Sequence, residues 1–336
     1  MKRIGIYIIA TVMVGLGCSR DKLKRDLLPG VSGSAGEVVI VMEPSVWSSE
    51  TGKNFRALLT EETPGLPQSE PLLNPVSISM KAFTELFKIH RNLIIAQISP
   101  SIEKRGIQVE YNKWAKPQLV ITMLAPNRQS FDSLFMENEQ KILGLLLKAE
   151  RDRLIQNYEN YPEFTLIRRI EKNAGLKLTI PKGYSYDMDT INFHWIALET
   201  PDISQGLFIY YYDYTDSSTF TANYLIEKRN EFLKKFVSSQ APGSYMTTEL
   251  QVFPVFRSFE LNGKYTAELR GLWKMENDFM GGPFVSISQL DPYRNRVVTV
   301  EGFVYAPKFN KRNYIRQLEA ILYSLQIVDP KQADKK

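Results

Sequence analysis

Residues that could carry acid–base or nucleophilic chemistry are few in this chain of 336 residues. It contains one cysteine, Cys18, and two histidines, His90 and His194. His90 follows an apolar helical pattern, and His194 alternates with apolar residues in "INFHWIALE"; both positions are typical of partly buried imidazoles. The sequence has no G-x-S-x-G elbow, H-E-x-x-H helix or phosphate-binding loop. It therefore predicts no catalytic residue and no cofactor, while a site assembled from distant segments stays open.

Two pairs of aspartates have a spacing that could present oxygens to a cation. Asp187 and Asp189 lie two residues apart, and Asp213 and Asp216 lie three apart. Clustered carboxylates can hold Ca²⁺, but these stretches lack the further oxygens and the glycine of an EF-hand-like loop. Turn formation and helix capping explain the aspartates more simply. We therefore predict no metal site.

An aromatic stretch, "GLFIYYYDYTD", offers the strongest candidate for ligand binding. In a strand, Tyr210, Tyr212 and Tyr214 fall on one face. Trp195 and Trp273 could join them in a stacking surface for a glycan or a peptide. The alternative is that this face packs into the core beneath a helix.

The N-terminus has the pattern of an export signal. Lys2 and Arg3 precede an apolar run that is too short to span a bilayer but suits the central region of a signal peptide. The small residues before Cys18 resemble the lipobox of bacterial lipoproteins, although Gly15 stands where that motif usually has an apolar residue. The resemblance implies cleavage before Cys18 and acylation of its sulfur, which would attach the protein to a membrane. An uncleaved signal with a membrane-buried cysteine stays open.

Composition and charge exclude several classes of protein. Hydrophobic residues make up 43% and charged residues 24%, which are values of globular proteins. The net charge of +5 is small and scattered, so we predict no nucleic-acid partner. The basic residues that follow Cys18 could contact anionic lipid headgroups or simply belong to a solvated tether.

We predict five segments along the chain: a signal peptide over 1–17, the lipidated Cys18 with a flexible tether over 18–36, an N-terminal domain over 37–173, a C-terminal domain over 174–328, and a disordered tail over 329–336. The predicted strands form hairpins, and helices lie between groups of strands. This order predicts an α+β fold of two layered domains with antiparallel sheets and covering helices.

Several local patterns predict individual elements. A helix should begin near Asn127 or Ser130 and run to about Glu159, and a further helix should end before Gly175. The pattern of residues 79–91 predicts one helix of about three turns. Asn262-Gly263 predicts a hairpin. Both "QLVITMLAP" and "VVTVEGFVYAP" precede a long helix, which suggests an internal duplication in which the two halves would share one strand order.

The overall layout resembles an uncharacterised family of Bacteroidota lipoproteins, a domain-of-unknown-function family. The residues that carry this likeness are "GLGCS", "EVVIVMEPSVWSSETG", "HRNLIIAQI", "FTLIRRIEKNAGLKLTIPKGY" and "PFVSISQLDPYRNRVVTVEGFVYAP". The second half is also similar to the PsbP/Mog1-type α/β/α sandwich, which implies a binding or assembly module. Neither resemblance brings a known activity with it.

These observations favour an outer-membrane lipoprotein that binds an envelope protein or a glycan without catalysis. Ser19 after the cysteine resembles the pattern of lipoproteins sent to the outer membrane, and the absence of an acidic cluster there favours the periplasmic face. The alternative is an enzyme, a hydrolase acting on glycan or cell-wall substrates with carboxylates from distant segments. Carboxylates converging in a pocket would favour the hydrolase, and an open apolar pocket would favour the binding module.

Overall fold

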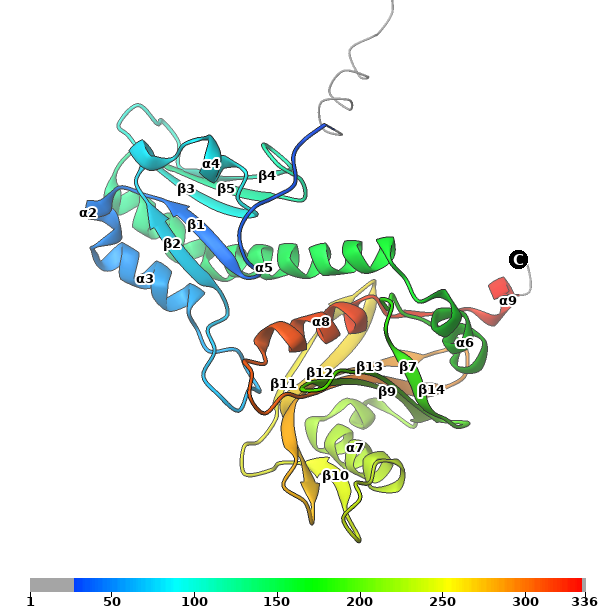
Figure 1. The fold of residues 1–336 in the computed structure, drawn as a ribbon. Helices are drawn as coiled ribbons and strands as arrows, with labels where there is room; N and C mark the ends of the chain where they lie inside the picture. The colour runs from blue at the N-terminus through cyan, green and yellow to red at the C-terminus, as the bar shows by residue number, and fades with distance from the viewer. Residues whose placement is uncertain (1–26, 334–336) are drawn as a thin grey trace, which may run out of the picture. The chain divides into compact units, whose positions relative to one another are not determined.

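The computed structural model describes residues 27–333, so Cys18 and the predicted signal peptide lie outside the described residues. The chain forms two compact units (Figure 1). The first is built mainly from Val38–Trp47 and Val76–Phe135, and the second from Ala35–Glu37, Ser48–Pro75 and the chain from Met136 onward. The second unit thus begins before the predicted boundary at residue 174 and also takes in an earlier segment.

The first unit contains a five-stranded sheet in the order β2-β1-β3-β5-β4. Its strands are β1 (Glu37–Val41), β2 (Asn74–Ile78), β3 (Asn92–Ile98), β4 (Gly106–Tyr111) and β5 (Leu119–Ala125). The pairs β1–β3 and β3–β5 are parallel, whereas β4–β5 is antiparallel. The central strands are almost continuously buried apolar runs, as is typical of strands in parallel sheets. The α+β class is confirmed, but this sheet is mixed rather than antiparallel.

Short helices accompany this sheet. They are α2 (Pro44–Trp47), η1 (Met80–Ala82) and α4 (Glu85–Lys88), while α3 (Glu50–Leu59) belongs to the second unit. The single helix predicted over residues 79–91 is wrong. The Ser79 side chain caps η1, and Thr84 adopts an extended backbone that interrupts the helix before α4.

His90 lies after α4 in a buried position of the first unit. Its Nδ1 is 3.2 Å from the carbonyl oxygen of Asn92. Gly33, with a φ of +92°, packs on the imidazole so closely that a Cβ there would lie 2.2 Å from the ring. Ser32 also exchanges backbone hydrogen bonds with Ile89 and Arg91. The end of the predicted flexible tether is therefore an ordered part of the first unit, because its backbone pairs there.

Two helices follow β5 as expected. α5 (Arg128–Asn160) begins where Asn127 Oδ1 accepts a hydrogen bond from the N–H of Ser130. α6 (Phe164–Ala174) ends at Gly175, whose left-handed φ of +68° closes the helix. Both predictions are confirmed because caps are local signals.

The second unit is built on an antiparallel eight-stranded sheet in the order β10-β12-β13-β14-β9-β8-β7, with β11 also paired to β12. Its strands are β7 (Ser185–Asp189), β8 (Phe193–Glu199), β9 (Ser204–Asp213), β10 (Tyr245–Thr248), β11 (Val255–Leu261), β12 (Lys264–Glu276), β13 (Gly281–Asp291) and β14 (Arg296–Tyr305). β6 (Leu176–Lys177) and β15 (Gln326–Ile327) form a separate small pair. The β11–β12 hairpin turns at Asn262-Gly263 as predicted.

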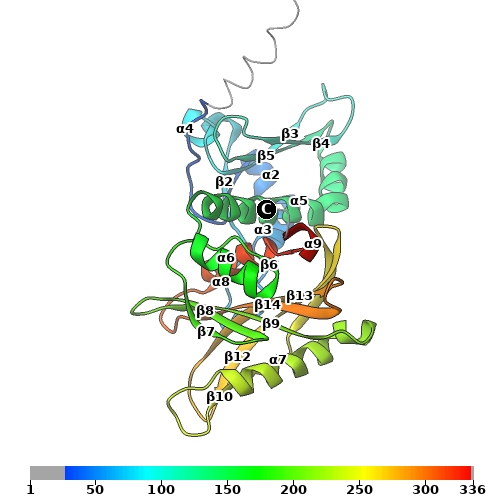
Figure 2. The ribbon, with the colours of Figure 1, turned by 90° about the vertical axis from the view of Figure 1, so that its right-hand side faces the viewer.

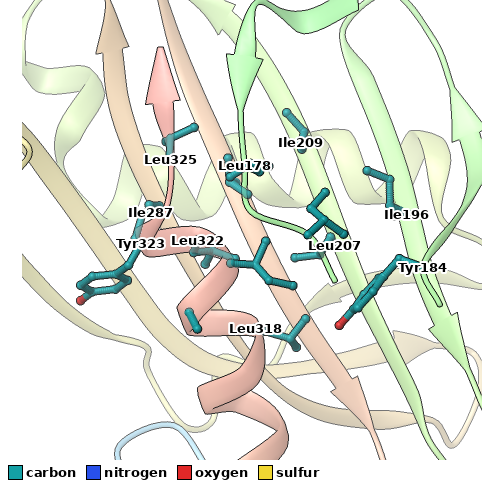
Figure 3. Close-up of a cluster of buried hydrophobic side chains, with 14 of the residues drawn as sticks. Leu178, Tyr184, Ile196, Leu207, Ile209, Ile287, Leu318, Leu322, Tyr323 and Leu325 are labelled. Atoms are coloured by element: carbon teal, nitrogen blue, oxygen red, sulfur yellow. The ribbon is translucent and has the colours of Figure 1, made fainter. Parts of the chain in front are cut away.

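Helices cover both faces of this sheet (Figure 2). α6 and α8 (Arg312–Tyr323) pack on one face, where Leu318 and Leu322 meet Leu207 and Ile287 (Figure 3). α7 (Ala222–Phe236), which follows η2 (Ser217–Phe220), packs on the other face. α9 (Pro330–Ala333) falls within the predicted disordered tail, which is thus partly helical.

The two sheets differ in strand order and in strand direction. An internal duplication would have given both units one topology. The matching strand-Ala-Pro-helix patterns therefore do not come from a repeated fold.

Candidate functional site

Most of the predicted aromatic ligand-binding residues lie in the core beneath α7. Tyr210 and Trp273 are each only 2% exposed. Tyr210 stacks on Phe232 of α7, and the Trp273 indole donates to the carbonyl oxygen of Val304 at 3.3 Å. A stacking surface needs exposed ring faces, so these two residues do not form one.

Tyr212 and Trp195 lie on the same covered face. The Tyr212 ring lies 6.0 Å from that of Tyr224 on α7, and Trp195 packs edge-on against Phe208. The strand periodicity correctly divided β9 into two faces, but the face with Tyr210 and Tyr212 packs under a helix.

Tyr214, the remaining predicted residue, lies in an open groove of the second unit. The groove has a volume of about 780 Å³. We call it the apolar groove, and its lining residues are Tyr214, Ser217, Phe220, Thr221, Ala222, Phe256, Lys264, Tyr265, Leu290 and Pro292. Lys264 is the charged member of this set, and the aromatic rings dominate the rest. Phe220 contacts Tyr265 edge-on at 5.5 Å between ring centroids.

The edge strand β11 leads from this groove into an exposed apolar segment. Leu250, Val252, Phe253 and Val255 are each about half exposed. Contiguous exposed apolar surface of this kind marks interaction sites in soluble domains. Among the described strands, only β12 pairs with β11.

The hairpin register fixes which backbone groups of β11 point outward. Leu261 pairs with Lys264 across the two-residue turn, so alternate residues from Leu261 backwards bond to β12. The N–H and C=O groups of Phe256, Ser258 and Glu260 therefore point away from β12. These three residues lie at an exposed sheet edge.

A second pocket, of about 530 Å³, lies in the second unit near the α8 face of the sheet. We call it the arginine pocket. Its charged lining residues are Lys148, Glu150, Arg151, Arg257, Glu268, Arg270, Arg316 and Glu319, with Tyr323 beside them.

Glu268 is the most heavily hydrogen-bonded carboxylate of the arginine pocket. It accepts from Arg257 Nε and Arg270 Nε, each at 2.6 Å, and from the Tyr323 hydroxyl at 2.7 Å. Nη2 of Arg257 and Nη2 of Arg270 each donate to the other carboxylate oxygen, Glu268 Oε2, at 3.1 Å. Both guanidinium groups therefore hold the carboxylate in a bidentate fashion.

Glu319 of α8 extends this network. Its Oε1 lies 3.1 Å from both Arg270 Nη2 and Arg151 Nη1. The Arg151 guanidinium in turn lies 3.9 Å from the centre of the Tyr323 ring. The side chains thus form one connected set of charges.

The electrostatics of these carboxylates oppose a role in proton donation. Burial alone would raise the pKa of Glu268 and of Glu319, but the neighbouring guanidinium charges outweigh it and lower both. The pKa of Glu268 falls to about 2. A general acid of a glycoside hydrolase instead needs a raised pKa.

His194, one of the two histidines that could carry acid–base chemistry, is buried on the sheet face that α6 covers. Its Nδ1–H donates to Asp189 Oδ1 at 2.7 Å, and Arg169 holds the other oxygen of Asp189. Burial lowers the pKa of His194, and the hydrogen bond to Asp189 offsets this only in part. Nε2 is enclosed without a hydrogen-bond partner, and His194 lines neither the apolar groove nor the arginine pocket.

Sequence reasoning missed both the outer edge of β11 and the arginine pocket. "AELRGLW" places Glu268 and Arg270 two residues apart in an otherwise apolar strand, which indicates a charged pair on one face. "QVFPVF" similarly concentrates apolar residues just before the predicted hairpin.

Within residues 27–333, no three histidine, cysteine, aspartate or glutamate side chains are grouped as a metal ion would require. In the same range, no helix is both long enough and apolar enough to cross a membrane.

Comparisons with known families assign the chain to no described activity. Residues 31–159 match a family model described as "Domain of unknown function (DUF8532)". Residues 164–324 match a second one, "Domain of unknown function (DUF4837)". None of the curated proteins matches the chain. The chain thus carries, one after the other, two regions that fit uncharacterised domain families.

Proposed function

We propose that this protein is a lipid-anchored binding module of the bacterial outer membrane that recruits an extended segment of another envelope protein at β11. The observation that carries the recruitment is the apolar groove beside an exposed strand edge. The lipobox-like sequence around Cys18 supports the anchor, and the resemblance to Bacteroidota lipoproteins supports the compartment. The absence of an acidic cluster after Cys18 supports the further proposal that the module faces the periplasm.

Strand addition suits this surface on two counts. The outward N–H and C=O groups of Phe256, Ser258 and Glu260 can pair with an incoming strand. Alternate side chains of that strand would then lie over the apolar groove, beside Phe256 and Tyr265. Main-chain pairing supplies affinity, and the aromatic lining selects apolar side chains.

A binding role also agrees with the charge arrangement in the arginine pocket. The carboxylates Glu268 and Glu319 are held ionised by arginines, so neither is suited to protonate a leaving group. This disfavours the alternative of a hydrolase at that pocket.

We expect Ser258→Pro to abolish recruitment while the sheet stays intact. Proline removes the N–H of residue 258, which points outward, and leaves the bonds between β11 and β12 in place. The measurement is photo-crosslinking in cells from a benzoyl-phenylalanine at Tyr265, with crosslinked proteins identified by mass spectrometry.

The matched control for this variant is Ser258→Ala, which keeps the N–H and should retain the crosslink. A crosslinker at Tyr111, an exposed residue of the first unit, reports non-specific contacts. A crosslinked protein found equally with Ser258→Pro, or from Tyr111, would refute strand addition at β11.

The anchor is tested separately at Cys18. Cys18→Ala should abolish labelling by radioactive palmitate and release the protein from the membrane fraction, because the thioether-linked lipid requires the sulfur. Ser19→Ala is the control and should keep both properties. Undiminished palmitate labelling of Cys18→Ala would overturn the anchor.

A further inference from the structure

The arginine pocket carries more positive than negative charge. One lysine and four arginines line it, against three glutamates. Glu150 pairs with Arg153 and Lys148 pairs with Asp152, and both of these partners lie outside the lining set. Four lining arginines then face two carboxylates, Glu268 and Glu319, which are each shared between two of the arginines. The carboxylates present therefore leave about two positive charges uncompensated.

Arg316 of α8 is the clearest uncompensated cation. It forms no ion pair with any described carboxylate. Its Nη2 donates to the carbonyl oxygen of Leu72, while Nη1 is buried without an acceptor. Burial lowers the pKa of the Arg316 guanidinium to about 10, and the positive charge of Arg312 acts in the same direction. The charges of Glu319 and Glu150 oppose this lowering of the pKa only in part. The positive charge is thus held at a cost that a bound anion would offset.

Most of the remaining pocket wall is apolar, with Thr63, Gln140 and Ser258 as its uncharged polar members. Leu72, Leu143, Leu147, Val255 and Ile315 line it together with the charged groups. A volume of about 530 Å³ lies within the range of pockets for small molecules. A ligand of this pocket should therefore carry both an anionic group and an apolar part.

We propose that the arginine pocket binds a phosphate monoester that carries an apolar body. A phosphate monoester has nearly two negative charges at neutral pH and three acceptor oxygens, which matches the excess of about two positive charges. A carboxylate would balance only one of them. Arginine is also the side chain best shaped to bind phosphate oxygens in pairs.

The test is isothermal titration calorimetry with hexyl phosphate on the full chain held in phosphatidylcholine nanodiscs. We expect hexyl phosphate to bind more tightly than inorganic phosphate, which lacks the apolar chain. It should also bind more tightly than hexyl glucoside, which lacks the phosphate. Arg316→Gln should weaken hexyl phosphate binding roughly 10-fold or more, and Arg316→Lys should weaken it less. Equal binding by Arg316→Gln and the parent protein, or no binding of hexyl phosphate, would contradict the proposal.

Two further variants keep this test independent of folding defects. Arg257→Gln alters a side chain that is half exposed, so it should fold and still bind hexyl phosphate less tightly. Arg168→Gln removes an equal charge from the exposed side of α6, away from the pocket, and should bind like the parent. A loss with Arg168→Gln as large as with Arg316→Gln would show general charge attraction and overturn the site.

The same chemistry could come from a lipid headgroup or from a soluble ligand. Nanodiscs that contain phosphatidic acid distinguish these sources. If the headgroup occupies the pocket, such discs should reduce hexyl phosphate binding by the parent protein; a soluble source predicts no reduction. With either source, Arg316→Gln should bind hexyl phosphate less tightly than the parent protein, because both sources place the phosphate in the arginine pocket.

Discussion

Replacing Arg229 by methionine should lower the free energy of unfolding of the second unit by about 3–5 kcal/mol. Arg229 and Glu301 form an ion pair in which both side chains are fully buried. Arg229 Nε lies 2.9 Å from one carboxylate oxygen and Nη2 lies 2.7 Å from the other. Removing the arginine would leave the carboxyl of Glu301 buried without its donors.

The pair also connects three elements of the α7 face. Arg229 comes from α7, Glu301 from β14, and Thr248 of β10 accepts from Arg229 Nη1 at 2.8 Å. The guanidinium further lies 3.8 Å from the centre of the Phe284 ring. Removing Arg229 should therefore loosen the packing of α7 against the sheet. It should also leave the charge of Glu301 in an apolar environment.

Denaturant unfolding followed by near-ultraviolet circular dichroism measures this effect. The double variant Arg229→Met with Glu301→Leu should recover most of the loss, because two apolar side chains leave no buried charge. Lys228→Met, which breaks a more exposed pair with Glu231, is the control and should change stability by less than about 1 kcal/mol. A double variant no more stable than Arg229→Met would contradict the explanation.

The dependence on pH provides a second readout for the Arg229→Met variant. Burial already raises the pKa of Glu301, and the charge of Arg229 counteracts that rise. Without Arg229 the folded state should hold a proton on Glu301 more tightly than the unfolded state does. The stability of Arg229→Met should then fall, relative to the parent, as the pH rises above the unfolded pKa of glutamate.

Local signals in the sequence were sufficient to predict several elements of the fold. Asn127, Gly175 and the Asn262-Gly263 turn each fix a helix end or a hairpin through the residue's own backbone preferences. The two faces of β9 also follow from the alternation of side chains. Such features depend on neighbours in sequence, so one sequence suffices to find them.

The sites could not be predicted in the same way, because they join distant residues. Glu268 of β12 meets Tyr323 of α8, and Arg151 of α5 meets Glu319. No spacing in the sequence shows that these residues share a pocket. Likewise, the aromatic face of β9 was identified, but only the structure shows that α7 covers Tyr210 and leaves Tyr214 in the apolar groove. Burial by a distant helix decides whether an aromatic side chain is core or surface.

Replacing Glu268 by glutamine should lower the free energy of unfolding at pH 7 by roughly 3 kcal/mol, from the difference between its folded and unfolded pKa values. The pKa of Glu268 in the folded protein is about 2, below the ordinary value of a glutamate. The stabilisation by its charge is therefore complete above the unfolded pKa and is lost as the pH falls towards 2. At pH 3, the difference between the parent and Glu268→Gln should shrink to about half.

Guanidinium unfolding of both proteins at pH 7 and pH 3 measures this difference. Glu260→Gln on β11 is the matched control, since Glu260 is exposed and should change stability little at either pH. A Glu268→Gln defect of the same size at both pH values would mean that lost hydrogen-bond geometry, not lost charge, destabilises the variant. The predicted shrinkage instead requires that Arg257 and Arg270 stabilise the ionised form of Glu268, which is the same excess of guanidinium charge that makes the arginine pocket suited to an anion.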